Sequence, residues 1–188
     1  MDPDPFRGRN IVVGVTGGIA AYKAAELVSQ LRQRGAELTV VMTAAATRFV
    51  QPLTFAVLTA RPVITDLFAR PDRYEADHVA LAQRSEVAIV APATANFLAK
   101  AAAGIADDAL STTILSLSCP IVVAPAMNHR MWNNPAVQEN LRRLRERGFH
   151  IVEPEEGWLA CGEVGKGRLA DIQTIIQAAA EALSAPRT

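Results

Sequence analysis

Four short, nearly continuous runs of apolar residues constrain the fold of this chain most strongly. They occupy residues 11–15, 38–42, 87–91 and 121–124. Apolar residues that do not alternate with polar ones are typical of strands buried on both faces, as in a parallel sheet covered by helices. Weaker strand candidates follow around residues 62–64 and 150–152.

Helical patterns separate these runs. Residues 20–31 repeat apolar side chains at helical spacing before a glycine stop, and residues 134–148 begin with Asn-Pro and end in glycine. Residues 171–183 begin with an aspartate cap. The alternation predicts an α/β fold with an open parallel sheet, a Rossmann-like or flavodoxin-like three-layer sandwich, in which residues 1–188 form a single domain.

Composition argues against several classes of function. Nineteen Lys and Arg balance nineteen Asp and Glu, so we expect no basic surface for nucleic acid or a membrane. The first apolar run is too short for a signal peptide or a membrane span, which predicts a cytoplasmic protein. Cys119 and Cys161 lack the spacing of a metal or redox motif, so we expect free thiols and no bound metal.

Glycines follow the first predicted strand. Gly17 and Gly18 open a helix, where unpaired backbone N–H groups and the helix dipole favour a phosphate. Their spacing matches neither the dinucleotide nor the nucleoside-triphosphate motif. The second strand ends at Thr43, whose hydroxyl can bond a phosphate, where dinucleotide folds place an acidic residue. A mononucleotide is therefore favoured; the alternative is that the glycines only permit a tight turn.

Three later loops concentrate small, amide and charged residues. Residues 92–96 read Pro-Ala-Thr-Ala-Asn and can hydrogen-bond a planar heterocycle closely. Residues 125–132 contain Asn128, which can orient a carboxylate or an amide. Residues 158–168 combine Cys161 with glycines and charges, as a closing flap does. Ligands of such sheets bind at the carboxyl ends of the strands, so these loops are the place to look for a site.

Together these motifs resemble those of the flavin-containing cysteine decarboxylases over nearly the whole chain. Residues 17–23 resemble the family's phosphate turn, 92–96 its Pro-Ala-Ser/Thr-Ala-Asn signature and 125–132 its Pro-x-Met-Asn-x-x-Met-Trp signature. Residues 104–110 resemble a segment that lines the flavin. Residues 160–168 resemble the flap of the coenzyme A branch, which the lantibiotic peptidyl-cysteine branch does not share in this form.

This resemblance implies FMN as the cofactor and 4′-phosphopantothenoyl-L-cysteine as the substrate, converted to 4′-phosphopantetheine. It implies that the cysteine thiol is first oxidised to a thioaldehyde, which lets carbon dioxide leave as an enethiol forms. The residues that it implies for FMN binding are Gly17, Gly18, Thr43, Thr94, Ala95, Asn96 and Met127.

The resemblance also implies roles for five side chains. His78 would handle a proton near the thiol or the carboxylate. Asn128 would hold the substrate carboxylate, and Cys161 would supply a proton or hydrogen when the enethiol is reduced. Lys166 and Arg168 would lower the pKa of the Cys161 thiol and bind the substrate phosphate.

Other functions and assemblies stay open. A flavodoxin-type electron carrier needs the same sheet but no reactive thiol, a flavin-binding regulator needs no catalysis, and a peptidyl-cysteine decarboxylase acts on a peptide ending in cysteine. The resemblance implies a homotrimer or a homododecamer. No phosphopantothenate-cysteine ligase domain follows Thr188, so we expect either a stand-alone enzyme or the decarboxylase part of a chain fused or associated with that ligase.

Overall fold

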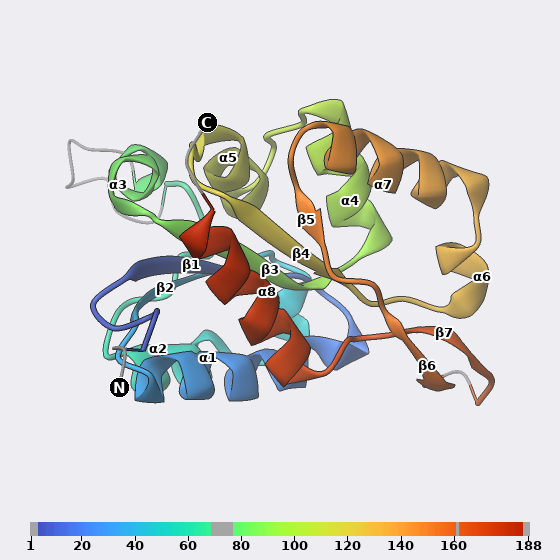
Figure 1. Cartoon of the computed structure of the whole chain (residues 1–188), viewed down its shortest axis with the longest axis horizontal. Helices are drawn as coiled ribbons and strands as arrows, with labels where there is room; N and C mark the ends of the chain where they lie inside the picture. The colour runs from blue at the N-terminus through green and yellow to red at the C-terminus, as the bar shows by residue number, and fades with distance from the viewer. Residues whose placement is uncertain (1–3, 69–76, 161, 186–188) are drawn as a thin grey trace.

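A five-stranded parallel sheet forms the centre of the computed structural model, which describes residues 4–68, 77–160 and 162–185 (Figure 1). The strand order is β2-β1-β3-β4-β5. This is the flavodoxin-like order of doubly wound sheets, and it confirms the predicted fold class. The strands are β1 Asn10–Val15, β2 Glu37–Met42, β3 Val87–Ala93, β4 Ile121–Pro125 and β5 His150–Ile151.

Helices cover both faces of this sheet (Figure 1). One face packs against α1 (Lys23–Gln33), α2 (Pro52–Thr59) and α8 (Ile172–Ser184). The other packs against α3 (Asp77–Arg84), α4 (Ala95–Ala103), α5 (Ala109–Ser116) and α7 (Pro135–Glu146). Shorter turns are η1 Ile19–Tyr22, η2 Ala46–Arg48 and α6 His129–Trp132. None of the helices in the described ranges is long and apolar enough to cross a lipid bilayer.

The continuous apolar runs predicted the strands because helices bury both faces of the sheet. In β3, for example, every side chain is buried, whichever face it points to. The weaker candidate at residues 62–64 forms only an isolated bridge between Ile64 and Val41. The segment that we expected to be a loop-like flap contains an antiparallel hairpin of β6 (Glu155–Trp158) and β7 (Val164–Arg168). Glu, Gly and Lys dominate these strands and are depleted in strands generally, so composition gave no signal for them.

Predicted helix ends are confirmed at the residues that cap them. The side chains of Asn134 and Asp171 each accept a hydrogen bond of 2.9 Å from the backbone N–H two residues later, at the starts of α7 and α8. Gly35 and Gly148 follow α1 and α7 with φ of +84° and +82°, a conformation that favours glycine. Local chemistry therefore sets these boundaries.

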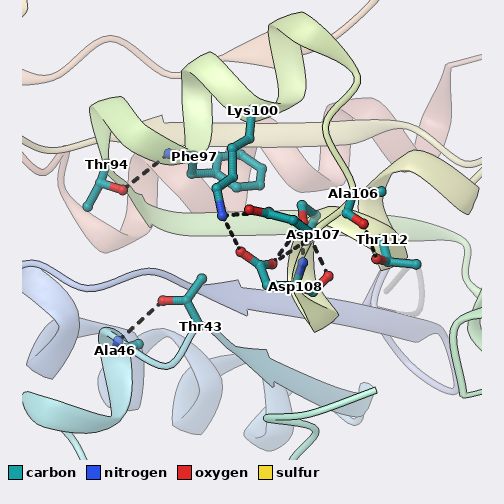
Figure 2. Close-up of polar contacts among 10 residues, drawn as sticks. Thr43, Ala46, Thr94, Phe97, Lys100, Ala106, Asp107, Asp108 and Thr112 are labelled. Atoms are coloured by element: carbon teal, nitrogen blue, oxygen red, sulfur yellow. Dashed lines mark hydrogen bonds and ion pairs between the residues drawn. The ribbon is translucent and has the colours of Figure 1, made fainter. Parts of the chain in front are cut away.

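Asp108 fixes the start of α5. Its carboxylate accepts a hydrogen bond from the Ser111 backbone N–H at 2.8 Å, and the Ser111 hydroxyl accepts one from the Asp108 N–H at 3.1 Å. Lys100 of α4 pairs with both Asp107 and Asp108 (Figure 2). Burial tends to raise the pKa of Asp108, but hydrogen bonds from Lys100 and Ser111 outweigh it and hold that pKa below its usual value. Hydrogen bonds to Asp107 and Asp108 raise the pKa of Lys100.

We expect Asp108→Ala to lower the free energy of unfolding by about 1 kcal/mol, because α5 loses its N-cap. Asp108→Asn keeps a capping oxygen and removes only the charge, so it costs less. The folded-state pKa of Asp108 is lowered, so the stabilisation from its charge is complete above the unfolded-state pKa and is lost as pH falls through the folded-state pKa. Urea unfolding of the three proteins at neutral and acidic pH measures this. A gap between wild type and Asp108→Asn that stays constant at acidic pH would contradict it.

Candidate ligand-binding site

A cavity of about 770 Å³ lies at the carboxyl ends of β1, β3 and β4. The loops that follow these strands and the β6–β7 hairpin form its wall. In this strand order the connections diverge between β1 and β3, which is where ligands of doubly wound sheets bind. The volume is in the range of small-molecule and cofactor sites. The predicted site residues that line it are Gly17, Gly18, Thr94, Ala95, Met127, Asn128 and Arg168.

The buried hydroxyl of Thr16 joins two of these loops. It donates a hydrogen bond to the Pro92 carbonyl at 2.7 Å and accepts one from the Thr94 N–H at 3.0 Å. The backbone N–H of Thr16 donates to the same carbonyl at 3.3 Å. Because both partners follow or end β3, the hydroxyl holds the loop after β1 against the loop after β3.

Gly17 is required by packing and also leaves a donor available. A Cβ at this position would lie 2.4 Å from the Cβ and 2.7 Å from the carbonyl carbon of Ala45, which is too close for any side chain. Within the described ranges, no oxygen accepts a hydrogen bond from the Gly17 N–H. At Gly18 a Cβ would meet only Thr94, at 3.6 Å. The turn is therefore both tight, as the alternative interpretation held, and suited to an acceptor-rich ligand.

Two predicted cofactor-binding residues lie outside the cavity lining. The Thr43 hydroxyl accepts a hydrogen bond from the Ala46 N–H at 3.2 Å and so closes the turn after β2 (Figure 2). Asn96 lies in the first turn of α4 and is exposed. Thr94, which does line the cavity, caps the same helix by accepting a bond from the Phe97 N–H at 3.4 Å (Figure 2).

Asn128 lines the cavity at the start of α6. Its side-chain oxygen accepts a hydrogen bond from the Arg130 N–H at 2.8 Å. Because capping uses the oxygen, a contact with a carboxylate has to come from the amide nitrogen, which is the donor that a carboxylate needs. Capping and ligand binding are thus compatible in one side chain.

The two other predicted catalytic residues are not placed by the structure. His78 belongs to α3, but its side chain lies outside what the structure describes, and Cys161 lies outside the described residues. Their predicted roles stay predictions. In the described part of the chain, no cluster of three or more His, Cys, Asp or Glu side chains is arranged to hold a metal ion.

Both predicted phosphate-binding cations of the hairpin are paired with carboxylates. Arg168 lines the cavity, and its guanidinium nitrogen lies 2.5 Å from a carboxylate oxygen of Glu155. The hydrogen bond from Arg168 is the main reason that the pKa of Glu155 lies below its usual value. Lys166 lies outside the lining, with its Nζ 2.8 Å from Glu153. Both cations are therefore already engaged in ion pairs within the hairpin or beside it.

Lys23 is a cavity residue that the sequence motifs did not single out by itself. It lies at the start of α1 and lines the cavity beside the glycine turn. Of the two cations in the lining, Lys23 and Arg168, Lys23 has no carboxylate partner among the described residues. The available signal was its place at the end of the glycine-turn motif.

Residues 104–110, which resemble a flavin-lining segment, lie outside this lining. Gly104 and Ile105 instead line a second cavity of about 310 Å³ beside α4, α5 and α7. Leu110 packs so closely on Gly14 of β1 that a Cβ there would lie 2.6 Å from the leucine side chain. The segment supports the sheet beneath the site.

Comparison with known proteins shows the family. The model of the family described as Flavoprotein matches residues 2–184. The chain belongs to this flavoprotein family. The coenzyme A biosynthesis bifunctional protein CoaBC of Bacillus subtilis is 48% identical over 185 residues, and that of Mycolicibacterium smegmatis is 46% identical over 167. These matches cover 96% and 89% of this chain but 46% and 40% of the relatives, so this flavoprotein spans less than half of their length.

Solved structures share the fold of this flavoprotein. The FMN-dependent cysteine decarboxylase SpaF is 39% identical with a TM-score of 0.83, covering 96% of this chain and 99% of that one. A variant of PPC decarboxylase in complex with pantothenoylaminoethenethiol is 28% identical with a TM-score of 0.82, covering 91% and 96%. The family identified from the sequence motifs is confirmed, and membership supports a flavin as the cofactor.

We expect Thr16→Val to lower the free energy of unfolding by about 1–3 kcal/mol, because the partly buried Thr94 N–H loses its acceptor while the shape of the side chain is kept. Thr16→Ser retains the hydroxyl and serves as the control. Urea denaturation of the three proteins measures the effect. Equal destabilisation by valine and serine would show that the hydroxyl does not hold the two loops together.

Proposed function

We propose that this flavoprotein catalyses the FMN-dependent decarboxylation of 4′-phosphopantothenoyl-L-cysteine to 4′-phosphopantetheine, a carboxy-lyase step of coenzyme A biosynthesis in the cytoplasm. The observation that carries the proposal is the 48% identity with the CoaBC protein of Bacillus subtilis over 96% of this chain. The signature motifs support it, since they lie on loops around one cavity. The similarity to the solved structure of a PPC decarboxylase agrees with it.

FMN fits the residues around the cavity. When bound, FMN supplies the oxidising and reducing equivalents that make loss of a simple carboxylate possible. The Gly17 N–H would provide a backbone donor for its phosphate, and Gly18, whose own N–H donates to the Thr16 carbonyl at 3.1 Å, would let the phosphate approach the turn. Thr94, Ala95 and Met127 would contact its rings. Thr43 and Asn96 remain proposed FMN contacts, although they lie outside the cavity lining.

The substrate would meet residues of α6, α1 and the hairpin. Asn128 would hold the carboxylate through its amide N–H group, which an acceptor-only carboxylate requires. Lys23 is better suited than Lys166 to attract a phosphate, because Lys166 already pairs with Glu153. Arg168 lines the cavity and would reach a phosphate while keeping one side of its guanidinium on the hairpin.

Two further proposed roles follow the family resemblance. His78 would accept or donate a proton near the thiol or the carboxylate, since imidazole titrates near neutral pH. Cys161 would supply a proton or hydrogen when the enethiol is reduced to the thiol. The positive charges of Lys166 and Arg168 on the same hairpin would favour its thiolate.

The assembly is part of the proposal. We expect a homotrimer or a homododecamer. We also expect the decarboxylase to act fused or associated with a phosphopantothenate-cysteine ligase domain, because the matched CoaBC relatives are named bifunctional and extend well beyond the region that this chain covers.

A second candidate is decarboxylation of a peptide that ends in cysteine. SpaF, named an FMN-dependent cysteine decarboxylase, is 39% identical over 99% of its chain, so its similarity to this chain is not restricted to one part of the fold. Both candidate substrates end in a cysteine whose nitrogen is in an amide bond and whose thiol and carboxylate are free. They differ in whether the remainder is a phosphopantothenoyl group or a peptide.

The first test offers both substrates to the purified protein after incubation with FMN. We expect loss of one carbon dioxide from 4′-phosphopantothenoyl-L-cysteine by mass spectrometry, together with an FMN absorption spectrum. Reaction of only a cysteine-terminated peptide would favour the second candidate. Bound flavin with neither reaction would favour an electron carrier or a regulator, and a protein that binds no flavin would refute the proposal.

We expect Asn128→Asp to lower kcat/KM for this substrate about 100-fold or more, because a donor is replaced by a charge that repels the substrate carboxylate. Aspartate is an equally good N-cap, so α6 keeps its first turn and the thermal unfolding midpoint should change little. Steady-state kinetics and thermal unfolding measure the two effects. Asn133→Asp, one residue after α6, is the matched control and should keep wild-type kinetics. Near-wild-type activity of Asn128→Asp would exclude the assigned contact.

A further inference from the structure

The β6–β7 hairpin rests directly on the segment after β4 and on α6 (Figure 1). The Gly167 carbonyl accepts a hydrogen bond from the Met127 N–H at 2.9 Å. A Cβ on Gly167 would lie 2.2 Å from the Met127 carbonyl oxygen, and a Cβ on Gly165 would lie 2.8 Å from the Cβ of His129. Backbone therefore packs against backbone and side chain here, which only glycine permits.

A carboxylate of the hairpin faces two polar side chains of α6. One oxygen of Glu163 lies 3.0 Å from a guanidinium nitrogen of Arg130. The other lies 3.4 Å from Nδ1 of His129. This nitrogen is buried, and no described group meets it with hydrogen-bond geometry. A carboxylate only accepts hydrogen bonds, so the approach is attractive when Nδ1 carries the proton, and a small movement completes the bond.

These contacts adjoin the wall of the cavity. The Glu163 carbonyl accepts a hydrogen bond from the N–H of Leu159, a lining residue, so Glu163 closes the turn of the hairpin beside the site. The helix α6, whose residues His129 and Arg130 contact Glu163, begins directly after Asn128. Asn128 is the residue proposed to bind the substrate carboxylate. The proposed substrate ligand and the contacts with the hairpin therefore lie on adjacent residues, Asn128 to Arg130.

We propose that His129 is a positioning residue: its Nδ1–H, together with Arg130, binds Glu163 and seats the β6–β7 hairpin on α6. The seated hairpin sets the cavity wall formed by Trp158, Leu159 and Arg168. The seating of the hairpin on α6 is argued from contacts within this chain. Its effect on catalysis rests on the proposed function. Loss of the seat weakens the contacts between the cavity wall and the substrate, so KM rises.

Hydrogen exchange followed by mass spectrometry on the FMN-loaded protein tests the seat without substrate. His129→Ala and Glu163→Gln are expected to speed exchange of the peptide covering residues 155–168 by about two- to five-fold, the scale of a partly exposed ion pair. Glu146→Gln removes a carboxylate from an ion pair with Arg142 on α7 and should leave that peptide unchanged.

Conservative variants separate the donor from the bulk of the ring. In His129→Asn the amide nitrogen occupies the δ position of the imidazole, so this variant should restore wild-type exchange, whereas His129→Gln, with its donor one bond further out, should not. Gly165→Ala should speed exchange without altering any charge, because its Cβ pushes against His129. Equal exchange in wild type, His129→Ala and Glu163→Gln would overturn the proposal.

Steady-state kinetics provide a second test of the role of His129. With 4′-phosphopantothenoyl-L-cysteine, His129→Ala is expected to raise KM about five-fold. The effects of His129→Ala and Glu163→Gln on KM should be less than additive in the double variant, because both changes remove the same contact and only the Arg130 pair is left for Glu163→Gln to break. Additive effects of the two changes, or a fall in kcat alone, would overturn the assignment. If the wild-type protein decarboxylates no such substrate, the proposed function fails, while the exchange measurements still decide whether His129 seats the hairpin.

Discussion

The hydrogen bonds of the Thr16 hydroxyl hold the site together. A parallel sheet brings strand ends to one edge but leaves the loops beyond them independent. Thr16 joins the loop after β1 to the loop after β3. The Ala126 N–H then donates to the Ala93 carbonyl at 3.1 Å, and Met127 donates to Gly167 of the hairpin. One path of hydrogen bonds therefore connects all the segments that surround the cavity, and its first link is a buried side chain.

The sequence was most informative where one local rule determined the structure. Continuous apolar runs predicted the central strands because both faces of the sheet are covered, and Asn134 and Asp171 marked helix starts because their side chains replace a missing backbone partner. The hairpin escaped prediction because β6 and β7 owe their pairing to each other and their position to α6. Neither cause leaves a recognisable pattern in the sequences of the two strands, Glu-Glu-Gly-Trp and Val-Gly-Lys-Gly-Arg.

The site was predictable at the level of loops, and less so at the level of side chains. Motifs identified the segments around the cavity, yet Thr43 closes its own turn and Lys166 pairs with Glu153, which lies outside the flap motif. Lys23 is the opposite case: the motifs did not single it out, yet it lines the cavity, because its position depends on how α1 packs against the sheet. A motif fixes which backbone comes near the ligand, whereas the partner of each polar side chain, Ala46 for Thr43 and Glu153 for Lys166, lies outside the motif.

Glycines at the site show why tight packing and ligand binding are not competing explanations. Gly17 is excluded from carrying a side chain by Ala45, and Gly167 by the carbonyl of Met127. In both cases two loops approach so closely that the backbone itself becomes the wall of the cavity. A backbone wall presents N–H groups at positions set by the fold, so the same packing that demands glycine also preorganises donors for a ligand. The chemistry then depends on the few side chains, such as Asn128, that such a wall leaves room for.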